Sequence, residues 1–286
     1  MVRLRISPWL QGVAALWLAV PPPTWSMDEP CVRLEGQAIQ GGLLWGQVAP
    51  EAGVRFAGQA VPVLPDGSFL IGLGRDAPES IVLEIASPDE CMQDVKVGSR
   101  DYRLQHVEGV PQRTVTPSEA DQARIARERE KVRAAKALRL ERPAMIAEIQ
   151  AGFRWPVTGP ISGVYGSQRI YNGTPGAPHY GVDIARPAGT PVLAPAPGRV
   201  TLAEPDLFYS GGTVILDHGY GLSSSFLHMS AVSVSVGDEL RPGDVIGAIG
   251  ATGRATGPHL DWRMSWFAQR IDPQLLVPPM PESAMP

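Results

Sequence analysis

The sequence has few cysteines, little net charge and no apolar run long enough to cross a membrane, and each shortage excludes something. Two cysteines allow one disulfide at most. A formal net charge of −4 gives neither the basic footprint of a nucleic-acid-binding protein nor an electrostatic argument for anionic partners. The apolar run over residues 9–20 is too short and too interrupted for a membrane span.

What the sequence does have at its start is the form of an export signal. Arg3 and Arg5 give a positive beginning, the apolar run follows, and Thr24-Trp25-Ser26 is a suitable cleavage site. We predict a signal peptide over residues 1–26; the alternative is a retained N-terminal anchor. Either way the rest of the chain is exported, and we expect a periplasmic location, with an extracellular one as the alternative.

Export bears on the two cysteines, Cys31 and Cys91, which both follow the signal. An even pair in an oxidising compartment predicts one disulfide. In the chain-entropy model, closing a loop of about 60 residues stabilises the fold by a few kcal/mol.

We predict that residues 27–110 form a first unit, a small β-sandwich-like domain. Glycine and proline are abundant, and short apolar runs alternate with turn signals such as Pro65-Asp66-Gly67. The candidate strands are 31–34, 43–48, 54–56, 69–72 and 81–85. No group of chemically active side chains is visible here, and the isolated His106 is expected to lie at the surface.

A charged linker helix is predicted over residues 115–143. Thr116 is suited to the N-cap, Pro117 to the first helical position, and Glu119 completes a capping box. Apolar positions are sparse, and Pro143 is expected to end or kink the helix. We favour a solvated linker; the alternative is a helix that binds a partner.

We predict that residues 150–280 form a second domain, an antiparallel β-sheet with long loops on one side. Helical periodicity is almost absent, and the candidate strands are 191–194, 198–202, 212–217, 222–228, 245–249 and 259–264. We expect a structural role for His218, in a turn between two strands. The aromatic side chains of Trp262, Trp266 and Phe267 fit either a cleft lining or the core.

Three of the five histidines stand at three separate points of this domain, two of them with a carboxylate close by. His179 precedes Asp183 by four residues, and His259 precedes Asp261 by two. On a strand, alternate residues point the same way, so His259 and Asp261 can face one cleft. His228 ends its own apolar run and can face it too. Catalytic zinc takes three such ligands and keeps one position open.

A longer set of motifs resembles the LytM/lysostaphin-type zinc peptidases, peptidase family M23, which cut the peptides of bacterial peptidoglycan. The similarity runs from Phe153 to about Pro273 and rests on His179-Tyr-Gly-Val-Asp183, Gly189-Thr-Pro-Val-Leu-Ala-Pro-Ala-Pro-Gly198, Gly212-Thr-Val-Ile-Leu-Asp217, Phe226-Leu-His-Met229, Gly243-Asp-Val-Ile-Gly247, Gly250-Ala-Thr-Gly253 and Pro258-His-Leu260.

The resemblance implies a LytM-like, duplicated-hybrid-motif sheet and a role for each site residue. His179 and Asp183 would bind Zn2+, and His228 and His259 would be catalytic. Where the family has the second histidine of His-x-His, its third zinc ligand, this sequence has Asp261.

Asp261 leaves two hypotheses open. In the first, Asp261 is the third metal ligand, and the chain is a zinc endopeptidase acting on peptidoglycan peptides. In the second, the domain has lost catalysis and binds peptidoglycan or activates a cell-wall amidase during division. The other four positions are intact, which favours the first. A general exported protease is less well supported, because the motifs point to wall peptides.

Overall fold

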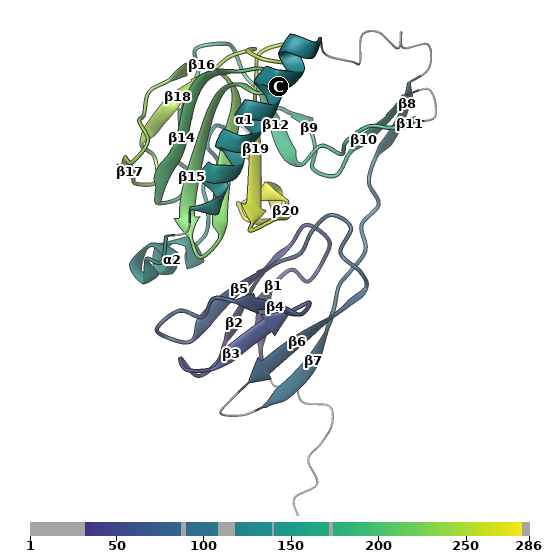
Figure 1. The fold of residues 1–286 in the computed structure, drawn as a ribbon, viewed down its shortest axis with the longest axis vertical. Coiled ribbons are helices and arrows are strands. Elements are labelled where there is room, and N and C mark those ends of the chain that lie inside the picture. Colours follow the sequence, from purple (N-terminus) through teal and green to yellow (C-terminus); the bar gives the residue numbers. More distant parts are fainter. Residues whose placement is uncertain (1–31, 87–89, 108–117, 139, 172–173, 282–286) are drawn as a thin grey trace, which may run out of the picture. The chain divides into compact units, whose positions relative to one another are not determined.

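A computed structural model describes residues 32–86, 90–107, 118–138, 140–171 and 174–281. It has the expected mainly β composition (Figure 1). The predicted signal peptide and Cys31 lie outside the described ranges, so the signal and the disulfide stay predictions. Within those ranges, no helix combines the length and the apolar character that a membrane crossing requires.

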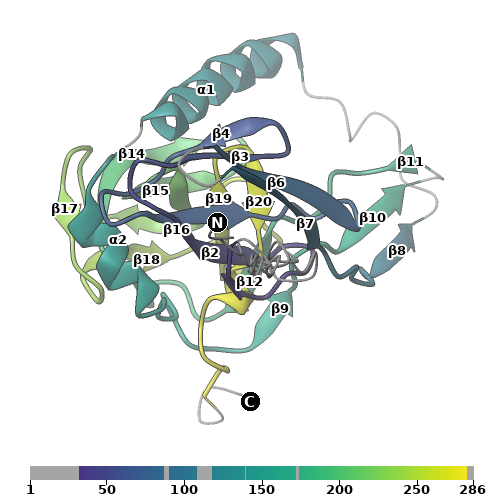
Figure 2. The ribbon, with the colours of Figure 1, turned by 90° about the horizontal axis from the view of Figure 1, so that it is seen from below.

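The N-terminal part consists of two small antiparallel sheets (Figures 1 and 2). One sheet has the order β1 (Leu34–Gly36), β2 (Leu43–Gln47) and β5 (Ser68–Gly72); the other has the order β4 (Gln59–Val61), β3 (Gly53–Phe56), β6 (Ser80–Ala86) and β7 (Cys91–Lys96). The sequence did not reveal β4 or β7. In β7 most side chains are exposed or half-buried, so the strand lacks the apolar pattern that prediction relies on.

A third small sheet joins segments far apart in the chain. The strand β8 (Leu104–Val107) pairs in parallel with β10 (Gln168–Tyr171), and β10 pairs with β11 (Thr174–Pro175). His106 lies on β8 and is exposed, as expected. Residues 104–107, predicted as part of the first domain, therefore pair with a strand from the second half of the chain.

The C-terminal part is built on one large antiparallel sheet (Figure 1). Its main path runs β17 (Glu239–Leu240), β14 (Gly198–Leu207), β15 (Gly211–Gly219), β16 (Leu222–Val232), β19 (His259–Trp266), β12 (Gly181–Ala185) and β9 (Ile161–Gly163). Beside this path lie β13 (Pro191–Leu193), β18 (Val245–Ile249) and β20 (Gln269–Ile271), and a 3-10 turn, η2 (Pro273–Leu275), follows. All six strands predicted here are present. The strand β14 extends to Leu207, beyond its predicted end at residue 202.

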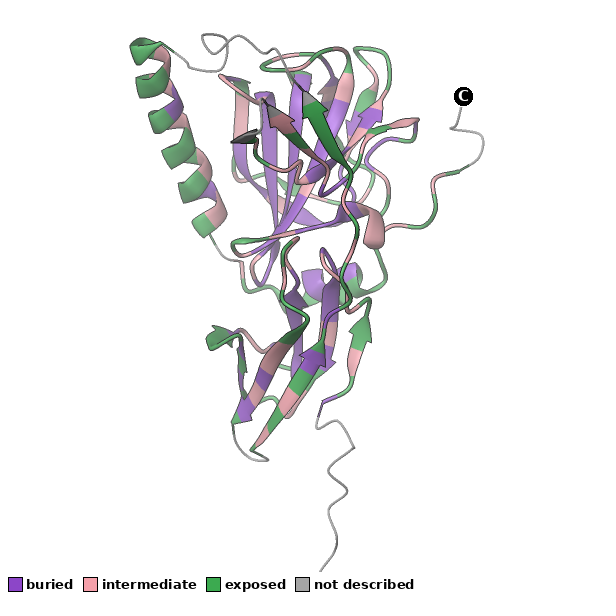
Figure 3. Ribbon diagram, turned by 90° about the vertical axis from the view of Figure 1, so that its right-hand side faces the viewer, coloured by how far each residue is buried: buried purple, intermediate pink, exposed green. Residues whose placement is uncertain are grey.

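Alternation along β19 separates core from site. Leu260, Trp262 and Met264 are fully buried and belong to the core. Of the two roles that the sequence allowed for Trp262, cleft lining or core, the structure therefore has the second. Trp266 and Phe267 also pack against this core. The intervening residues, including His259 and Asp261, face the other side of the sheet. Figure 3 shows the central strands of the sheet almost entirely buried.

The helix α1 (Glu119–Ala137) differs from its prediction at both ends and on one face. Its N-cap is Ser118, whose hydroxyl accepts from the backbone N–H of Asp121, and not Thr116. Pro143 does not end this helix; it occupies the first turn of a separate helix, α2 (Pro143–Gln150).

The expectation of a solvated linker was wrong for one face, because α1 packs on β14 and β15 (Figure 2). Its Ala135 joins a small apolar cluster with Leu202, Leu207 and Ile215. The solvent side of α1 is exposed, which explains its sparse apolar pattern (Figure 3).

Candidate metal centre

The three predicted metal ligands converge where β12 pairs with β19. Asp183 lies directly opposite Asp261 in this antiparallel pair, and His179 is in the segment that enters β12. One ligand atom from each of the three residues lies within 4.8 Å of the others. The side chains of His179 and Asp183 are about one-fifth exposed, whereas that of Asp261 is almost fully buried. Sheet register thus brings together residues up to 82 positions apart.

Two of these ligand atoms lack the partners that buried polar atoms normally have. Among the described residues, His179 Nε2 and Asp183 Oδ1 are buried and accept or donate no hydrogen bond, although they lie 3.2 Å apart. Leaving such groups unpaired is costly, so native proteins rarely do it. A cation between them would satisfy both. The donor set of one imidazole and two carboxylates therefore fits a divalent metal ion such as zinc.

Two glycines make room for the carboxylates. A Cβ at Gly163, on β9, would collide with the carboxylate of Asp183. A Cβ at Gly181, on β12, would collide with Asp261 Oδ1. Both carboxylates thus lie against bare backbone, and their orientations depend on these glycines.

His259 begins β19 beside the three ligands. Its Nδ1 lies 2.8 Å from the carbonyl oxygen of Gly257 and must donate, because a carbonyl can only accept. In the neutral ring the proton is then on Nδ1, and Nε2 carries the lone pair. That Nε2 lies 3.9 Å from Asp183 Oδ1, so its lone pair is at the edge of the ligand cluster.

His228 is held next to His259 by an unusual backbone. Its φ of +64° is in the left-handed region, which non-glycine residues rarely adopt, and the β15–β16 register shifts around it. The rings of His228 and His259 are 4.9 Å apart. Burial lowers the pKa of His228, which favours the neutral ring.

Thr252 is a positioning residue that sequence reasoning did not single out. Its carbonyl oxygen accepts from His228 Nδ1 at 2.8 Å, and its hydroxyl donates to the carbonyl oxygen of Met229. The same hydroxyl accepts from the backbone N–H of Gly212. The signal was present in the Gly250-Ala-Thr-Gly253 motif, which the resemblance included without a role.

Arg263 is the second residue that the sequence did not point to. Its guanidinium donates to both carboxylate oxygens of Asp261, at 2.5–3.0 Å. Burial raises the pKa of Asp261, but the charge and hydrogen bonds of Arg263 outweigh burial, and the net pKa is lowered. The carboxylate is therefore ionised at neutral pH. Its spacing of two residues from Asp261 on a strand was the available signal.

His218 lies outside this group and has the structural role that was expected. It is fully buried near the end of β15, with Nδ1 2.7 Å from the Pro197 carbonyl oxygen and Nε2 2.7 Å from Ser224 Oγ. The turn itself follows at residues 220–221.

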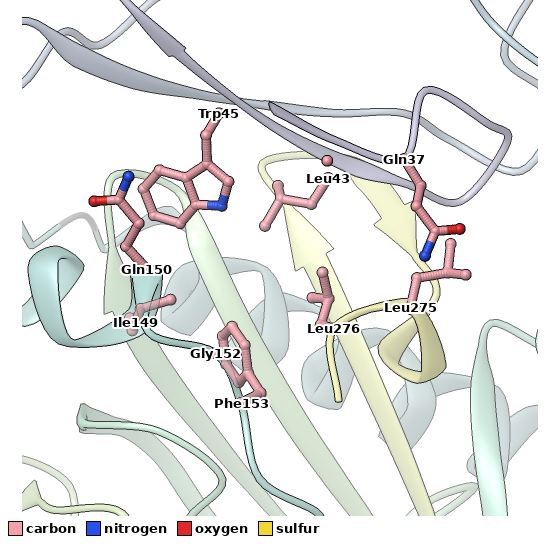
Figure 4. Close-up of a pocket in the computed structure, with 10 residues that line it drawn as sticks. Gln37, Leu43, Trp45, Ile149, Gln150, Gly152, Phe153, Leu275 and Leu276 are labelled. Atoms are coloured by element: carbon pink, nitrogen blue, oxygen red, sulfur yellow. The ribbon is translucent and has the colours of Figure 1, made fainter. Parts of the chain in front are cut away.

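A hollow of about 250 Å3 elsewhere in the described structure is not part of this centre (Figure 4). It is lined by Trp45, Phe153, Leu276 and neighbouring residues, none of them with a titratable side chain. Nothing in that hollow offers acid–base or metal chemistry.

Comparison with known proteins agrees with this description of the domain. The family model described as peptidase family M23 matches residues 177–273. A solved structure of a Pseudomonas aeruginosa protein assigned to peptidase M23 is 31% identical, with a TM-score of 0.62. The similarity covers 84% of this chain and 95% of that one.

Relatives of known name match over the same domain. DD-carboxypeptidase/endopeptidase Mpg of Neisseria meningitidis is 40% identical over 104 residues, which is 36% of this chain and 24% of Mpg. Cell division protein DipM of Caulobacter vibrioides is 31% identical over 140 residues, which is 47% of this chain and 22% of DipM. The chain thus matches about a quarter of the length of each.

An antiparallel sheet that carries a histidine and two carboxylates beside two further histidines is a domain of the metallopeptidase type. More specifically, the chain belongs to peptidase family M23, through the domain at residues 177–273.

Proposed function

We propose that this chain is an exported, zinc-dependent endopeptidase that hydrolyses cross-links or stem peptides of bacterial peptidoglycan. The observation that carries the proposal is the pair of buried, unpartnered atoms, His179 Nε2 and Asp183 Oδ1, which face a third ligand and a free histidine nitrogen. The names of relatives support the substrate: Mpg is a DD-carboxypeptidase/endopeptidase, and ShyA of Vibrio cholerae is a peptidoglycan DD-endopeptidase.

Each side chain has a part in this proposal. His179, Asp183 and Asp261 hold the ion. When bound, zinc supplies a Lewis acid that polarises a carbonyl and lowers the pKa of water. The free Nε2 of His259 is placed to accept a proton from the attacking water. His228 donates from Nδ1 to the Thr252 carbonyl, so Nε2 of its neutral ring carries a lone pair. Once Nε2 takes up a proton, the charged ring, 4.9 Å from that of His259, is placed to stabilise the charge that develops on the carbonyl oxygen.

The test is release of soluble muropeptides from isolated peptidoglycan by the purified protein. Replacing His259 by Ala removes the proton acceptor without touching the ligands, and we expect activity to fall by 100-fold or more, on the order of general-base contributions. His106→Ala, at an exposed histidine of β8, should leave activity unchanged. Activity that survives His259→Ala would contradict the assigned role.

A second candidate function is favoured by one observation, the engagement of both Asp261 oxygens by Arg263. If the guanidinium takes the place of a metal ion, the domain would be a non-catalytic module that binds peptidoglycan or activates a cell-wall amidase. The relative named as a cell division protein, DipM, makes this class relevant. Co-sedimentation with peptidoglycan, with no muropeptide released by the native protein, would support this candidate.

A further inference from the structure

The contact between Asp261 and Arg263 is the shortest ion pair among the described residues of the candidate metal centre. Nε of Arg263 donates to both oxygens of Asp261 at 3.0 Å, and Nη2 donates to Oδ2 at 2.5 Å. The side chain of Asp261 is 3% exposed and that of Arg263 is 31% exposed. A forked contact of this kind fixes the carboxylate plane as well as its position.

The neighbouring strands are shaped around this pair. On β12, Gly181 lies opposite Arg263, and a Cβ there would be 2.7 Å from Arg263 Cγ as well as colliding with Asp261. On β16, the residue opposite Arg263 is Ser225, whose buried hydroxyl oxygen has no hydrogen-bond partner among the described residues. A glycine and a serine on the two flanking strands thus leave space for the guanidinium.

The Asp261–Arg263 pair changes the net charge of the candidate metal centre. The third ligand is neutral when it is a histidine and carries a negative charge when it is an aspartate. Asp261 alone would give the centre two negative charges, which weakens the pull of a metal ion on its bound water. The positive charge of Arg263 cancels one of them. The centre then has the single negative charge that it would have with a neutral histidine at position 261.

A carboxylate held by arginine still has capacity to bind a metal ion. Its two oxygens offer about four lone-pair directions, and Arg263 makes three hydrogen bonds, two of them sharing Nε. Partners of this kind orient metal ligands in many proteins, and losing one typically weakens metal binding about 10–100-fold.

We propose that Arg263 is a positioning residue that holds Asp261 as the third metal ligand and cancels its charge, so that the Asp261–Arg263 pair replaces a neutral histidine. This inference rests on the proposed metal centre and goes beyond the ligand set itself. It assigns a function to Asp261, which stands where the family motif has a histidine.

The test is the zinc dissociation constant, measured on the full chain by competition with a chromophoric chelator. We expect Arg263→Gln to weaken zinc binding about 10-fold or more, and Arg263→Lys, which keeps the charge but loses the fork, to fall between it and the native protein. In the Asp261→His background, Arg263→Gln should not weaken zinc binding, because no carboxylate remains to be held.

The matched control is Arg270→Gln. Arg270 is a partly buried arginine on β20 that donates to Ser265 Oγ and acts on Asp261 through charge without a hydrogen bond, so zinc affinity should fall less than in Arg263→Gln. Circular dichroism of each variant with and without chelator confirms that it is folded.

Two results would overturn the inference while leaving the proposed function intact. Tighter zinc binding by Arg263→Gln would mean that the guanidinium competes with the ion, and unchanged binding would mean that it has no part in the site. Conversely, a native protein that binds zinc but releases no muropeptides would refute the proposed function alone, since the affinity measurements still test Arg263. A native protein that takes up no zinc would refute both.

Discussion

His218 and His228 lie on adjacent strands, and their surroundings give them different roles. His218 has both ring nitrogens hydrogen-bonded in a fully buried position, with no route to a ligand. His228 has only Nδ1 engaged, and its left-handed backbone directs the ring toward His259. Strain of this kind persists where function requires it. The sequence motifs predicted different roles for these two histidines, and their hydrogen bonds are consistent with that difference.

The burial of His218 predicts that folding stability falls in acid. Burial lowers its pKa from the usual 6.5 to about 4. Between these values the unfolded chain binds a proton that the folded chain does not, so stability rises with pH across this window and is lost as pH falls through it. We expect a loss of up to about 3 kcal/mol between pH 7 and pH 4 from this residue.

The measurement is urea unfolding of the native protein and His218→Asn at several pH values. The variant is expected to be less stable at pH 7, because it loses a satisfied buried ring, but to lose less on acidification. Equal acid sensitivity of the two proteins would contradict this prediction, because it would show that the pKa of His218 is the same in the folded and the unfolded chain.

At the scale of elements, the packing of α1 on the sheet was not predicted from its sequence. Its few apolar residues indicated a solvated helix, yet Val132 and Ala135 pack against an apolar cluster of β14 and β15. Ile215 of β15, which contacts α1, faces the same side of the sheet as Arg263, because both lie opposite Ser225. The helix therefore lies on the same face of the sheet as the candidate metal centre.

Lys136 anchors the end of α1 on this face and gives a second prediction. Its ammonium donates to Ser265 Oγ on β19, and burial, together with the nearby Arg270 and Arg263, lowers its pKa well below 10.5. Over the range between the lowered value and 10.5 the unfolded chain holds the extra proton, so stability rises with pH. Lys136→Met removes this cost and should raise the melting temperature at pH 7 by about 2–4 °C per kcal/mol gained.

Thermal melts at pH 7 and pH 9.5 test this, with Lys131→Met as the control. Lys131 is on the same helix, half-exposed, and pairs with Glu204 at 2.7 Å. The pH dependence should flatten in Lys136→Met and persist in Lys131→Met. A flattening in both, or in neither, would show that Lys136 is not the group responsible.

At the scale of the whole chain from Val32 onward, one apolar core links the N-terminal sheets to the large sheet. The same buried cluster includes Phe69 of β5 and Trp262 of β19, and a Cβ at Gly72 of β5 would be 2.6 Å from the Cβ of Trp266. The sequence predicted two separate domains because each half has its own strand pattern. It could not predict the packing between them, since that depends on contacts between residues almost 200 positions apart.

The same distinction applies to the site. The motifs that resemble family M23 grouped His179, Asp183 and Asp261. Strand alternation placed His259 and Asp261 on one face, because the spacing of alternate residues is local information. The positive φ of His228 and the carbonyl contact of Thr252 depend on a bulge and a distant loop, which no local pattern encodes. The spacing of Arg263 from Asp261 was a local signal as well, but the space for its guanidinium depends on the β12–β19 register, which places Gly181 opposite.

The central claim is that His179, Asp183 and Asp261 hold a metal ion, and its most direct test is the zinc content of the purified protein by elemental analysis. We predict about one zinc per chain in the native protein, as expected for a single catalytic site, retention in Asp261→His, and loss in His179→Ala. Native protein without zinc, alongside an Asp261→His variant that holds one ion, would contradict the claim and show that position 261 had lost its ligand function.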